Sequence, residues 1–318
     1  MSESALSIPA CPITGLPAVR LIQSISSDLL NGLWRASFGV VTEGQLGAGR
    51  RFGLWESPCG LFFFDPMIAG DGSFYRDLYN GWGKDGPWTK QVSERADYAR
   101  AAAMVKPKDR VLDIGCGAAG FADHVQHATY VGLDDNFPAT GAGAGADVRN
   151  ESLAAHAAAH AEEYDAVCAF HVVEHVPNLA QFVIDLQRCL KPGGYLILAV
   201  PKYPSAINDI PNFVFNAPPH HLSWWNEQAL RTFAESAGFQ VQSLEGLPVG
   251  AHHRLGYWMG RIAPNLTGEQ YFRHAKTWHC ALLWSFLAGR LCSALLGTPR
   301  GANPVELLLI ARKPVRTQ

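Results

Sequence analysis

A glycine-rich turn is the first segment of the sequence whose residue types and spacing could do chemistry. Residues 113–120 read DIGCGAAG and place three glycines in the spacing G-x-G-x-x-G directly after an apolar segment. Glycines at this spacing let the backbone come close to a ligand, and the N–H groups at the start of a following helix would face that ligand. The pattern predicts a ligand-binding turn between a strand at 110–114 and a helix through 121–127, and it does not name the ligand.

Two carboxylates near this turn narrow the choice of ligand. Asp113 precedes Gly115, so it would repel the pyrophosphate of a nicotinamide or flavin dinucleotide and attract the ammonium and sulfonium groups of S-adenosylmethionine (SAM). Asp134 follows Gly115 by 19 residues, about the spacing at which an acid reaches the hydroxyls of a ribose. The adjacent Asp135 is an alternative for this position, and Asp113 has the alternative of bracing the turn.

A third acidic residue and four histidines complete the set of candidates. Asp147 could accept a hydrogen bond from an adenine amino group while Val148 donates its backbone N–H, or Asp147 could be an ordinary exposed residue. A reaction at a hydroxyl group needs a base, and a histidine with its ordinary pKa near about 6.5 can take a proton near neutral pH. The candidate bases are His171, His175, His220 and His221.

Alternating strands and helices must position these side chains. From about residue 92, short apolar segments alternate with helical patterns, which is typical of a parallel sheet with helices on both faces. The expected strands lie at 110–114, 129–133, 147–148, 164–170, 195–200, 239–244 and 306–311; the expected helices lie at 93–104, 121–127, 152–162, 179–190 and 226–236, with a turn at 192–194. A long loop at 201–225 faces the carboxyl ends of the strands, where ligands bind in open α/β sheets.

Five segments together resemble the class I SAM-dependent methyltransferases in order and spacing. They read VLDIGCG, YVGLDDN, YDAVCAFHVVEHVPN, LKPGGYLILAVP and LSWWNEQALRTFAESAGFQV, and the resemblance covers about residues 92–247 plus the last strand. The resemblance implies a Rossmann-like α/β fold with a seven-stranded sheet whose last strand is reversed. It also implies SAM as the cofactor and S-adenosylhomocysteine as the product.

The resemblance implies roles for individual residues as well. The implied contacts are Asp113, Gly115, Cys116 and Gly117 around the methionine moiety, Asp134 or Asp135 at the ribose, Asp147 and Val148 at the adenine, and Phe170 and His171 along the methyl-transfer channel. In the family the pair Glu174 and His175 usually braces the sheet edge. The catalytic candidates are therefore His171, His220 and His221, with ordering of the loop as the alternative for the last two.

Residues 1–91 precede this core and are rich in aromatic residues, Gly and Pro, without a long helical period. We expect a cap that contains a strand at 62–64 and a short helix at 74–82. In this cap Tyr75, Tyr79 and Trp88 would cover SAM, where an aromatic ring attracts the sulfonium, or would simply pack as a lid.

Two short motifs in this cap are similar to the zinc knuckles of some sugar and glycan methyltransferases. They read Cys11-Pro-Ile-Thr14 and Glu56-Ser-Pro-Cys59, where a zinc knuckle would have C-x-x-C twice. Because one cysteine of each pair is replaced, we interpret the region as a remnant that binds no metal.

Residues 248–303 are expected to form a helical insertion, followed by the last strand and tail at 304–318. Its apolar window at 280–297 contains Arg290, and an arginine at the centre of a span costs about 2.5–3.5 kcal/mol on insertion scales. A buried or surface-seeking helix is therefore favoured over a membrane span. Trp278, Trp284 and Phe286 leave three interpretations open: a layer packed on the core, a lid or dimer contact, and a membrane-facing surface.

Composition excludes several classes of protein. The 318 residues carry 26 Lys and Arg against 28 Asp and Glu, which argues against a nucleic-acid binder that depends on a basic field. Seven scattered cysteines and a start without a signal peptide favour a reduced, cytoplasmic protein. We therefore expect a cytoplasmic methyltransferase, with membrane association and a homodimer as further possibilities, that acts on a hydroxyl of a small molecule or of a glycan or lipid-linked intermediate.

Other functions stay open at this point. The acceptor could be a carbon or nitrogen atom of a small metabolite. An NAD-dependent oxidoreductase and a catalytically silent binding protein are the rivals from other classes. No bound metal is expected, because the sequence shows no carboxylate cluster suited to Mg²⁺ beside the predicted site.

Overall fold

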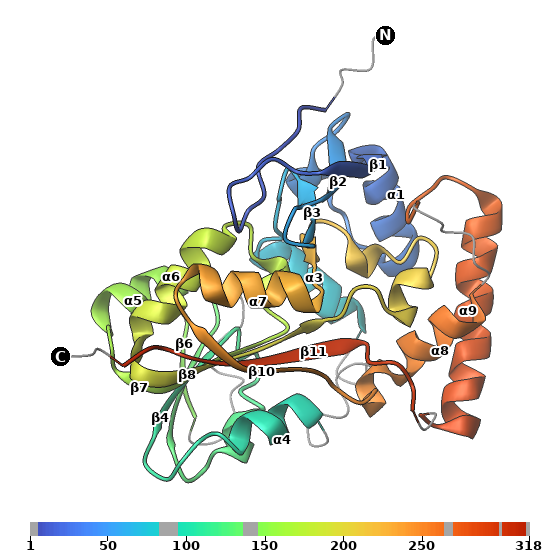
Figure 1. The fold of residues 1–318 in the computed structure, drawn as a ribbon. Coiled ribbons are helices and arrows are strands. Elements are labelled where there is room, and N and C mark those ends of the chain that lie inside the picture. The colour runs from blue at the N-terminus through green and yellow to red at the C-terminus, as the bar shows by residue number, and fades with distance from the viewer. Residues whose placement is uncertain (1–5, 83–94, 136–145, 264–269, 299–300, 316–318) are drawn as a thin grey trace.

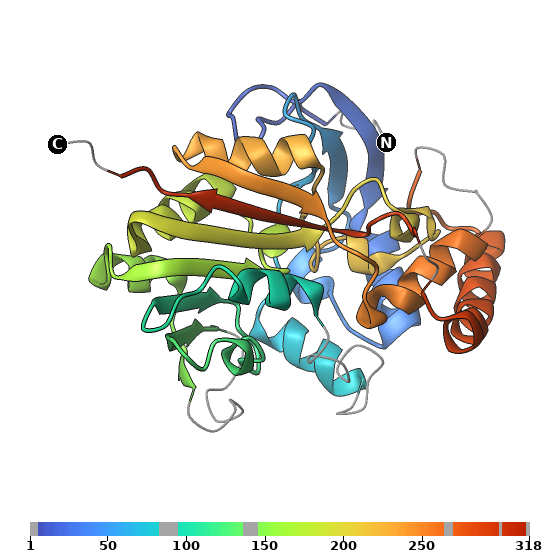
Figure 2. The same cartoon turned by 60° about the horizontal axis from the view of Figure 1, so that its bottom comes forward.

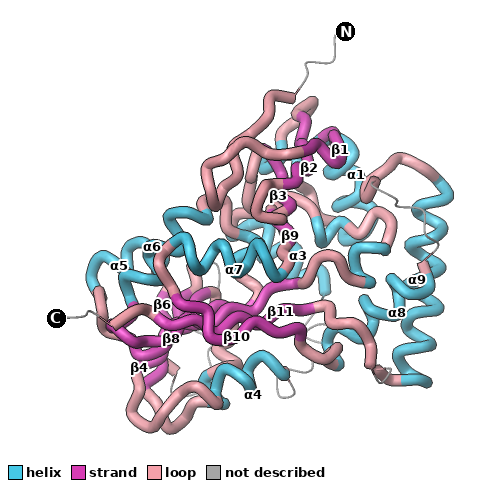
Figure 3. Tube along the Cα trace, viewed as in Figure 1, coloured by secondary structure: helices cyan, strands magenta, loops and turns pink. Residues whose placement is uncertain are grey.

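A seven-stranded sheet lies at the centre of the computed structural model, which describes residues 6–82, 95–135, 146–263, 270–298 and 301–315 (Figures 1 and 3). Its strands are β4 (Arg110–Ile114), β5 (Thr129–Leu133), β6 (Asp147–Arg149), β7 (Tyr164–Phe170), β8 (Leu190–Pro201), β10 (Gln240–Gly246) and β11 (Glu306–Arg312). They are ordered β10-β11-β8-β7-β4-β5-β6, and only β11 runs antiparallel to its neighbours. The predicted α/β fold with a reversed last strand is confirmed.

Helices cover both faces of this sheet (Figures 1 and 2). They are α4 (Ala96–Ala102), α5 (Leu153–Ala159), α6 (Leu179–Cys189) and α7 (Glu227–Ser236). Alternate residues of β4 point to opposite faces, so Leu112 joins the apolar cluster beneath α5, α6 and α7, while Val111 joins the cluster beneath α4. Burial on both faces explains why the central strands are continuously apolar.

Two local predictions in the core are wrong. No α-helix follows the glycine turn: the chain makes turns and one short 3₁₀ helix, Ala122–His124. Phe121 has a helical backbone, but Val125 leaves the helical region, with φ at −126° and ψ at 33°, so the segment ends after one short turn. The expected turn at 192–194 instead lies inside β8, where the Gly193 N–H donates to the carbonyl of Lys313 at 2.9 Å.

The N-terminal part forms a second sheet and three helices. The strands β1 (Arg20–Ser26), β2 (Arg51–Glu56), β3 (Phe62–Asp65) and β9 (Ser223–Trp224) pair in this order, beside α1 (Ser27–Phe38), α2 (Glu43–Leu46) and α3 (Gly72–Trp82). The expected strand and short helix correspond to β3 and α3. The helix α1 was not expected: the Ser26 hydroxyl caps it by accepting from the Leu29 N–H at 3.2 Å, and Leu30 and Trp34 bury its inner face.

The strand β9 connects the two sheets. It belongs to the long loop between β8 and α7, yet it pairs with β3, with Phe62 opposite Trp224. The next residue, Trp225, is buried in the cluster beneath α7. The loop is therefore fixed between the N-terminal sheet and the core instead of being free over the sheet edge.

The insertion before the last strand contains α8 (Arg254–Ile262) and α9 (Lys276–Leu296), which pack side by side at one end of the molecule (Figure 1). The contact is close because Gly289 lies against Met259: a Cβ atom on Gly289 would meet the Met259 side chain at 3.0 Å. The opposite face of α9 is exposed and apolar. Among the described residues, α9 is the one helix long and apolar enough to cross a membrane, with 17% of its apolar window buried.

Candidate functional site

The glycine turn lies where β4 ends, and a close contact explains its first glycine. Gly115 has a φ of +63°, and a Cβ atom there would meet the Val172 side chain at 2.5 Å. A larger residue would therefore strain the backbone and push the turn away from the segment that follows β7. This contact brings the turn against the segment that carries His171, Glu174 and His175.

Asp134 joins the turn from the end of β5. Its Oδ2 accepts a hydrogen bond from the backbone N–H of Gly117 at 2.9 Å. Asp135 is exposed, and Asn150 donates to the carbonyl oxygens of both aspartates, at 3.2 and 3.3 Å. Of the two candidates, Asp134 is the one whose carboxylate reaches the turn, where a ribose hydroxyl could share it.

Asp113 lies beneath the turn and is buried. Its Oδ2 accepts a hydrogen bond from the Tyr130 hydroxyl at 2.7 Å. Burial raises the pKa of Asp113 to about 7, against the opposing effects of the Tyr130 hydrogen bond and the Arg95 charge. A cationic group in the turn would favour the ionised carboxyl, so this group is sensitive to the charge of whatever binds above it.

The other residues predicted to contact the cofactor differ in their burial and in the side chains around them. The Asp147 carboxylate pairs with Arg149 at 2.9 Å, and Val148 lies opposite Gly132 in the sheet. Phe170 is buried in an aromatic cluster, where its ring centroid lies 4.8 Å from that of Tyr98 and 4.9 Å from that of Phe121, so it packs beneath the site. Cys116 is also buried, with its sulfur against Gly132.

His171 is held by two acidic side chains just past β7. Its Nε2 lies 3.0 Å from Glu306 Oε1, its Nδ1 lies 3.6 Å from Glu174 Oε1, and its φ is 59°, which is unusual for a residue other than glycine. Burial lowers the pKa of His171, but the two carboxylates outweigh it and raise the pKa to about 10. A ring that keeps both protons at neutral pH is poorly suited to be a base, so the structure favours a positioning role for His171.

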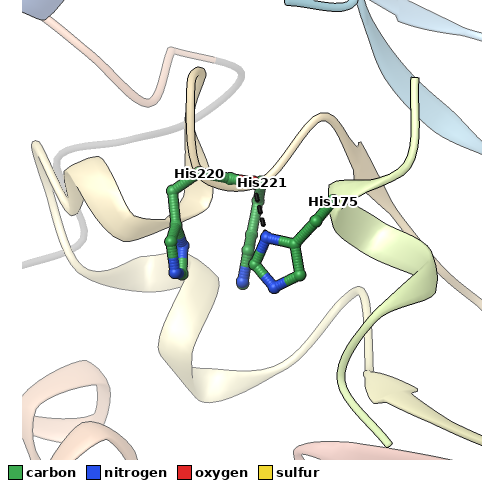
Figure 4. A group of neighbouring side chains, drawn as sticks. All are labelled: His175, His220 and His221. Atoms are coloured by element: carbon green, nitrogen blue, oxygen red, sulfur yellow. Dashed lines mark hydrogen bonds between the residues drawn. The ribbon is translucent and has the colours of Figure 1, made fainter. Parts of the chain in front are cut away.

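His220 and His221 meet His175 in a cluster of three rings (Figure 4). One ring nitrogen of each lies within 4.8 Å of one on each of the others. Burial and the neighbouring imidazoles hold the pKa of both His220 and His221 well below the ordinary value. At neutral pH these rings are neutral and carry a free lone pair, although burial makes them weak bases.

Aromatic side chains of α3 cover this histidine cluster. The Tyr75 hydroxyl lies 3.3 Å from Nδ1 of His175, and its ring centroid lies 6.1 Å from that of His220. Tyr79 stacks beside Tyr75 and is half-exposed. Trp88, the third aromatic residue of the predicted lid, lies outside the described residues.

Two buried acids were not among the predicted site residues. Glu174 is 1% exposed, and neither of its oxygens has a hydrogen-bond partner. Glu306, at the start of β11, pairs with His171 and lies 3.5 Å from His253. Glu306 is far from the other site residues in the sequence and belongs to no recognisable motif. Glu174 lies inside the segment YDAVCAFHVVEHVPN, where its expected role was to brace the sheet edge.

The two cysteines of the knuckle-like motifs meet in the interior. Cys11 Sγ and Cys59 Sγ lie 3.8 Å apart, and the Ser57 hydroxyl lies 3.1 Å from Cys59 Sγ. The structure thus brings the two half-motifs together. The hypothesis that they bind no metal stays a prediction.

Comparison with known proteins connects the core to a family. Residues 89–244 match the family model of a methyltransferase domain. The ubiquinone biosynthesis O-methyltransferases of Salmonella enteritidis and Salmonella gallinarum are each 29% identical, over 38% of this chain and 62% of the relative. The match thus spans less than two thirds of the length of these curated relatives.

Solved structures show more distant likenesses. A SAM-dependent methyltransferase from Archaeoglobus fulgidus has a TM-score of 0.44 and 17% identity, and covers 69% of this chain and 92% of its own. Coclaurine N-methyltransferase bound to N-methylheliamine and SAH has a TM-score of 0.45 and 16% identity, over 68% and 70% of the two chains. Likenesses this distant say nothing about the substrate.

Proposed function

Residues 89–244 of this chain are a class I SAM-dependent methyltransferase domain, and on that premise we propose that the protein transfers the methyl group of SAM to a hydroxyl oxygen. The proposed acceptor is a small molecule, or a glycan or lipid-linked intermediate. The observation that carries the proposal is the joining of the glycine turn to Asp134, whose carboxylate accepts from the Gly117 N–H. Transfer of the methyl group to a carbon or a nitrogen atom is the alternative within the same class of enzyme.

The turn and its carboxylates fit a cationic nucleoside ligand. Asp134 is placed to accept from ribose hydroxyls, and Asp113 provides a carboxyl whose ionisation a nearby ammonium would favour. When bound, SAM supplies an electrophilic methyl carbon on its sulfonium. The protein's own part is to hold the acceptor in line with that carbon, to exclude water and to remove the hydroxyl proton.

Three features support a hydroxyl acceptor beside the turn. The imidazoles of His220 and His221 are neutral and gather at the carboxyl edge of the sheet, where a proton or an acceptor oxygen could be held. The rings of Tyr75 and Tyr79 offer aromatic cover over the same region. The curated relatives are named as O-methyltransferases.

The exposed face of α9 supports contact with an anionic lipid surface, from which a lipid-linked acceptor could be taken. Its outward side chains Leu283, Trp284, Leu287, Leu291 and Leu295 are 56–73% exposed. The helix contains no acidic residue, and its charged side chains, Lys276 and Arg290, are basic. An apolar helix face with basic residues is the composition that binds at the interface of an anionic membrane.

Calorimetry tests the cofactor side of this proposal. Purified protein should bind S-adenosylhomocysteine with a stoichiometry near one, and NADH at the same concentration should produce no heat of binding. Binding of NADH alone would support an oxidoreductase, and binding of neither would support a catalytically silent protein.

A transfer assay tests the acceptor. Methyl-labelled SAM is incubated with sets of phenols, sugar alcohols and lipid-linked sugars, together with matched amines. Label that enters an ether, and is retained under conditions that cleave esters, supports the hydroxyl acceptor. Label on nitrogen or carbon alone would replace it with the alternative.

A further inference from the structure

Three imidazole rings converge from two separate segments of the chain. His175 belongs to the 3₁₀ helix Val173–His175 after β7, and His220 and His221 belong to the loop after β8. One ring nitrogen of each lies within 4.8 Å of one ring nitrogen of each of the others, and Figure 4 shows a nitrogen at the same end of each of the three rings. Neither backbone segment could bring the three rings together by itself.

Hydrogen bonds orient two of these rings. Nδ1 of His175 donates to the carbonyl oxygen of His220 at 2.7 Å, and Nδ1 of His220 donates to the carbonyl oxygen of Phe215 at 3.0 Å. Donation from Nδ1 leaves the lone pair on Nε2 in a neutral ring. This pattern, a ring N–H on a backbone carbonyl and a free second nitrogen, is the one that orients histidine ligands of metal ions.

A buried carboxylate lies beside the rings without a hydrogen-bond partner. Glu174 Oε1 lies 3.8 Å from Nε2 of His175 and 4.0 Å from Nε2 of His221, too far for a hydrogen bond. His171, whose Nδ1 lies 3.6 Å from Glu174 Oε1, compensates part of this charge, but both carboxylate oxygens still lack a hydrogen bond, which is costly for a buried charge. Two ligands that are each about 2.0–2.1 Å from a tetrahedral ion lie about 3.3–3.4 Å apart, so small side-chain movements would let an ion take the missing partner's place.

We propose that His175, His220 and His221 bind one divalent transition-metal ion of the zinc type, with the Glu174 carboxylate beside it as a fourth ligand or a counter-charge. Imidazole nitrogens with one carboxylate suit zinc and similar ions better than magnesium, which prefers oxygen ligands. The proposal revises the expectation that no metal is bound, which considered the knuckle-like cysteines and carboxylate clusters but not the histidines.

The position of the ion gives it a role that rests on the proposed methyl transfer. Val172 touches the turn at Gly115, and Tyr75 lies over the rings, so the cluster lies beside the region assigned to the acceptor. A hydroxyl bound to the ion loses its proton to solvent more readily than a free one. Its oxygen then forms the bond to the methyl carbon as the carbon–sulfur bond breaks, with that bond's electron pair left on the sulfur.

A second group of possible ligands is a weaker candidate. It consists of His171, His253 and Glu306. Nε2 of His171 already contacts Glu306 Oε1 at 3.0 Å, the geometry of an ordinary ion pair. His253 therefore offers a matched control, because it is a histidine in a similar setting that should not bind the ion.

Metal binding can be measured without any assay of activity. Untagged protein is treated with a chelator, dialysed and titrated with Co²⁺, whose tetrahedral complexes with nitrogen ligands absorb strongly in the visible range. One equivalent should bind with a tetrahedral spectrum, and Zn²⁺ should displace it and raise the unfolding temperature of the depleted protein. A spectrum of octahedral Co²⁺, or binding well below one equivalent, would overturn the proposal.

Substitutions locate the site. His175→Gln, His221→Gln and Glu174→Gln should each weaken Co²⁺ binding by about tenfold or more, while His253→Gln should leave it unchanged. An equal loss in His253→Gln would move the ion to the second group and overturn the assignment. If a variant fails to fold, depleted wild-type protein, which needs no substitution, still tests whether one ion binds in tetrahedral geometry.

Failure here is distinguishable from failure of the proposed function. If the protein binds S-adenosylhomocysteine and transfers methyl groups at full rate in the presence of chelator, the proposed function stands and the metal site is refuted. If the protein binds Co²⁺ in tetrahedral geometry but does not bind S-adenosylhomocysteine, the metal site stands and methyl transfer is refuted.

Discussion

The two halves of the candidate site are built in different ways. On the cofactor half, the bond from Gly117 to Asp134 joins residues 17 positions apart, across two neighbouring parallel strands. On the acceptor half, His175 and His220 are 45 positions apart, His171 and Glu306 are 135 apart, and the indole of Trp34 donates to the carbonyl of Pro218 across 184 positions. A motif can describe the first half, whereas only the folded chain assembles the second.

This difference predicts how the halves respond to change. A substitution on the cofactor half should alter the affinity for SAM, and one on the acceptor half should alter turnover and metal binding. The following experiments can break that separation, and they are ordered from the largest expected effect to the smallest.

Replacing Asp134 should have the largest effect. Asp134→Ala removes the carboxylate that reaches the glycine turn, and we expect the affinity for S-adenosylhomocysteine to fall by about a hundredfold, because hydrogen bonds to a charged group contribute about 1.5–3 kcal/mol. Asp135→Ala is the matched control and should change the affinity less than about twofold. Calorimetry measures both, and unchanged affinity in Asp134→Ala would refute the ribose role.

Replacing one histidine of the loop should affect turnover. His220→Ala and His221→Ala should each lower kcat by about ten- to a hundredfold while the affinity for S-adenosylhomocysteine changes little, because the rings act on the acceptor. Initial rates and calorimetry on the same preparations separate the two quantities. If both variants keep the full rate, neither ring is needed and transfer depends mainly on proximity.

The pH dependence of cofactor binding should report on Asp113. Its pKa is raised to about 7, so the folded, ligand-free protein carries a proton there that a free aspartate would lose at much lower pH. A cationic ligand favours the ionised form, so its binding releases this proton. The affinity for SAM should therefore rise by about tenfold as the pH rises from about 5.5 to 7.5.

Asp113→Asn provides the control for this dependence. The variant should bind SAM more weakly at pH 7.5 and show a flat profile over the same range. A wild-type profile that is also flat would mean that the ammonium of SAM does not lie near this carboxyl.

The smallest effect on the site is expected from α9. Leu287→Glu places a charge on the exposed apolar face, so it should abolish flotation with anionic phospholipid vesicles and shift the free energy of unfolding by less than about 0.5 kcal/mol. Affinity for S-adenosylhomocysteine should not change. Loss of a dimer in sedimentation, without any vesicle binding by the wild type, would assign this face to a second copy of the chain.

The sequence predicted the core well because the core is periodic. The strands of the large sheet were expected near their observed positions, and so was α7, which Asn226 caps by accepting from the Ala229 N–H at 2.8 Å. The failures have local causes. The helix after the glycine turn ends after one short turn because Val125 leaves the helical region, and α1 was hidden among aromatic residues that looked irregular.

The acceptor half could not be predicted to the same extent. The histidines were recognised as candidates, yet their sequence positions do not reveal that His220 and His221 meet His175, or that Glu306 reaches His171 from the last strand. The charge state of each ring is also set by its neighbours. His171 is held protonated by two carboxylates, while His220 is held neutral by burial among other imidazoles.

By itself the sequence determined the family, the order of the core elements and the candidate carboxylates near the glycine turn, because these follow from short-range periodicity and from motifs on adjoining strands. Only the tertiary structure decided which histidines share a space and which acid is left beside them without a hydrogen-bond partner. It also decided which face of α9 is exposed. The physical reason is that burial, ionisation and ligand geometry depend on neighbours in space, and on the acceptor half those neighbours come from distant parts of the chain.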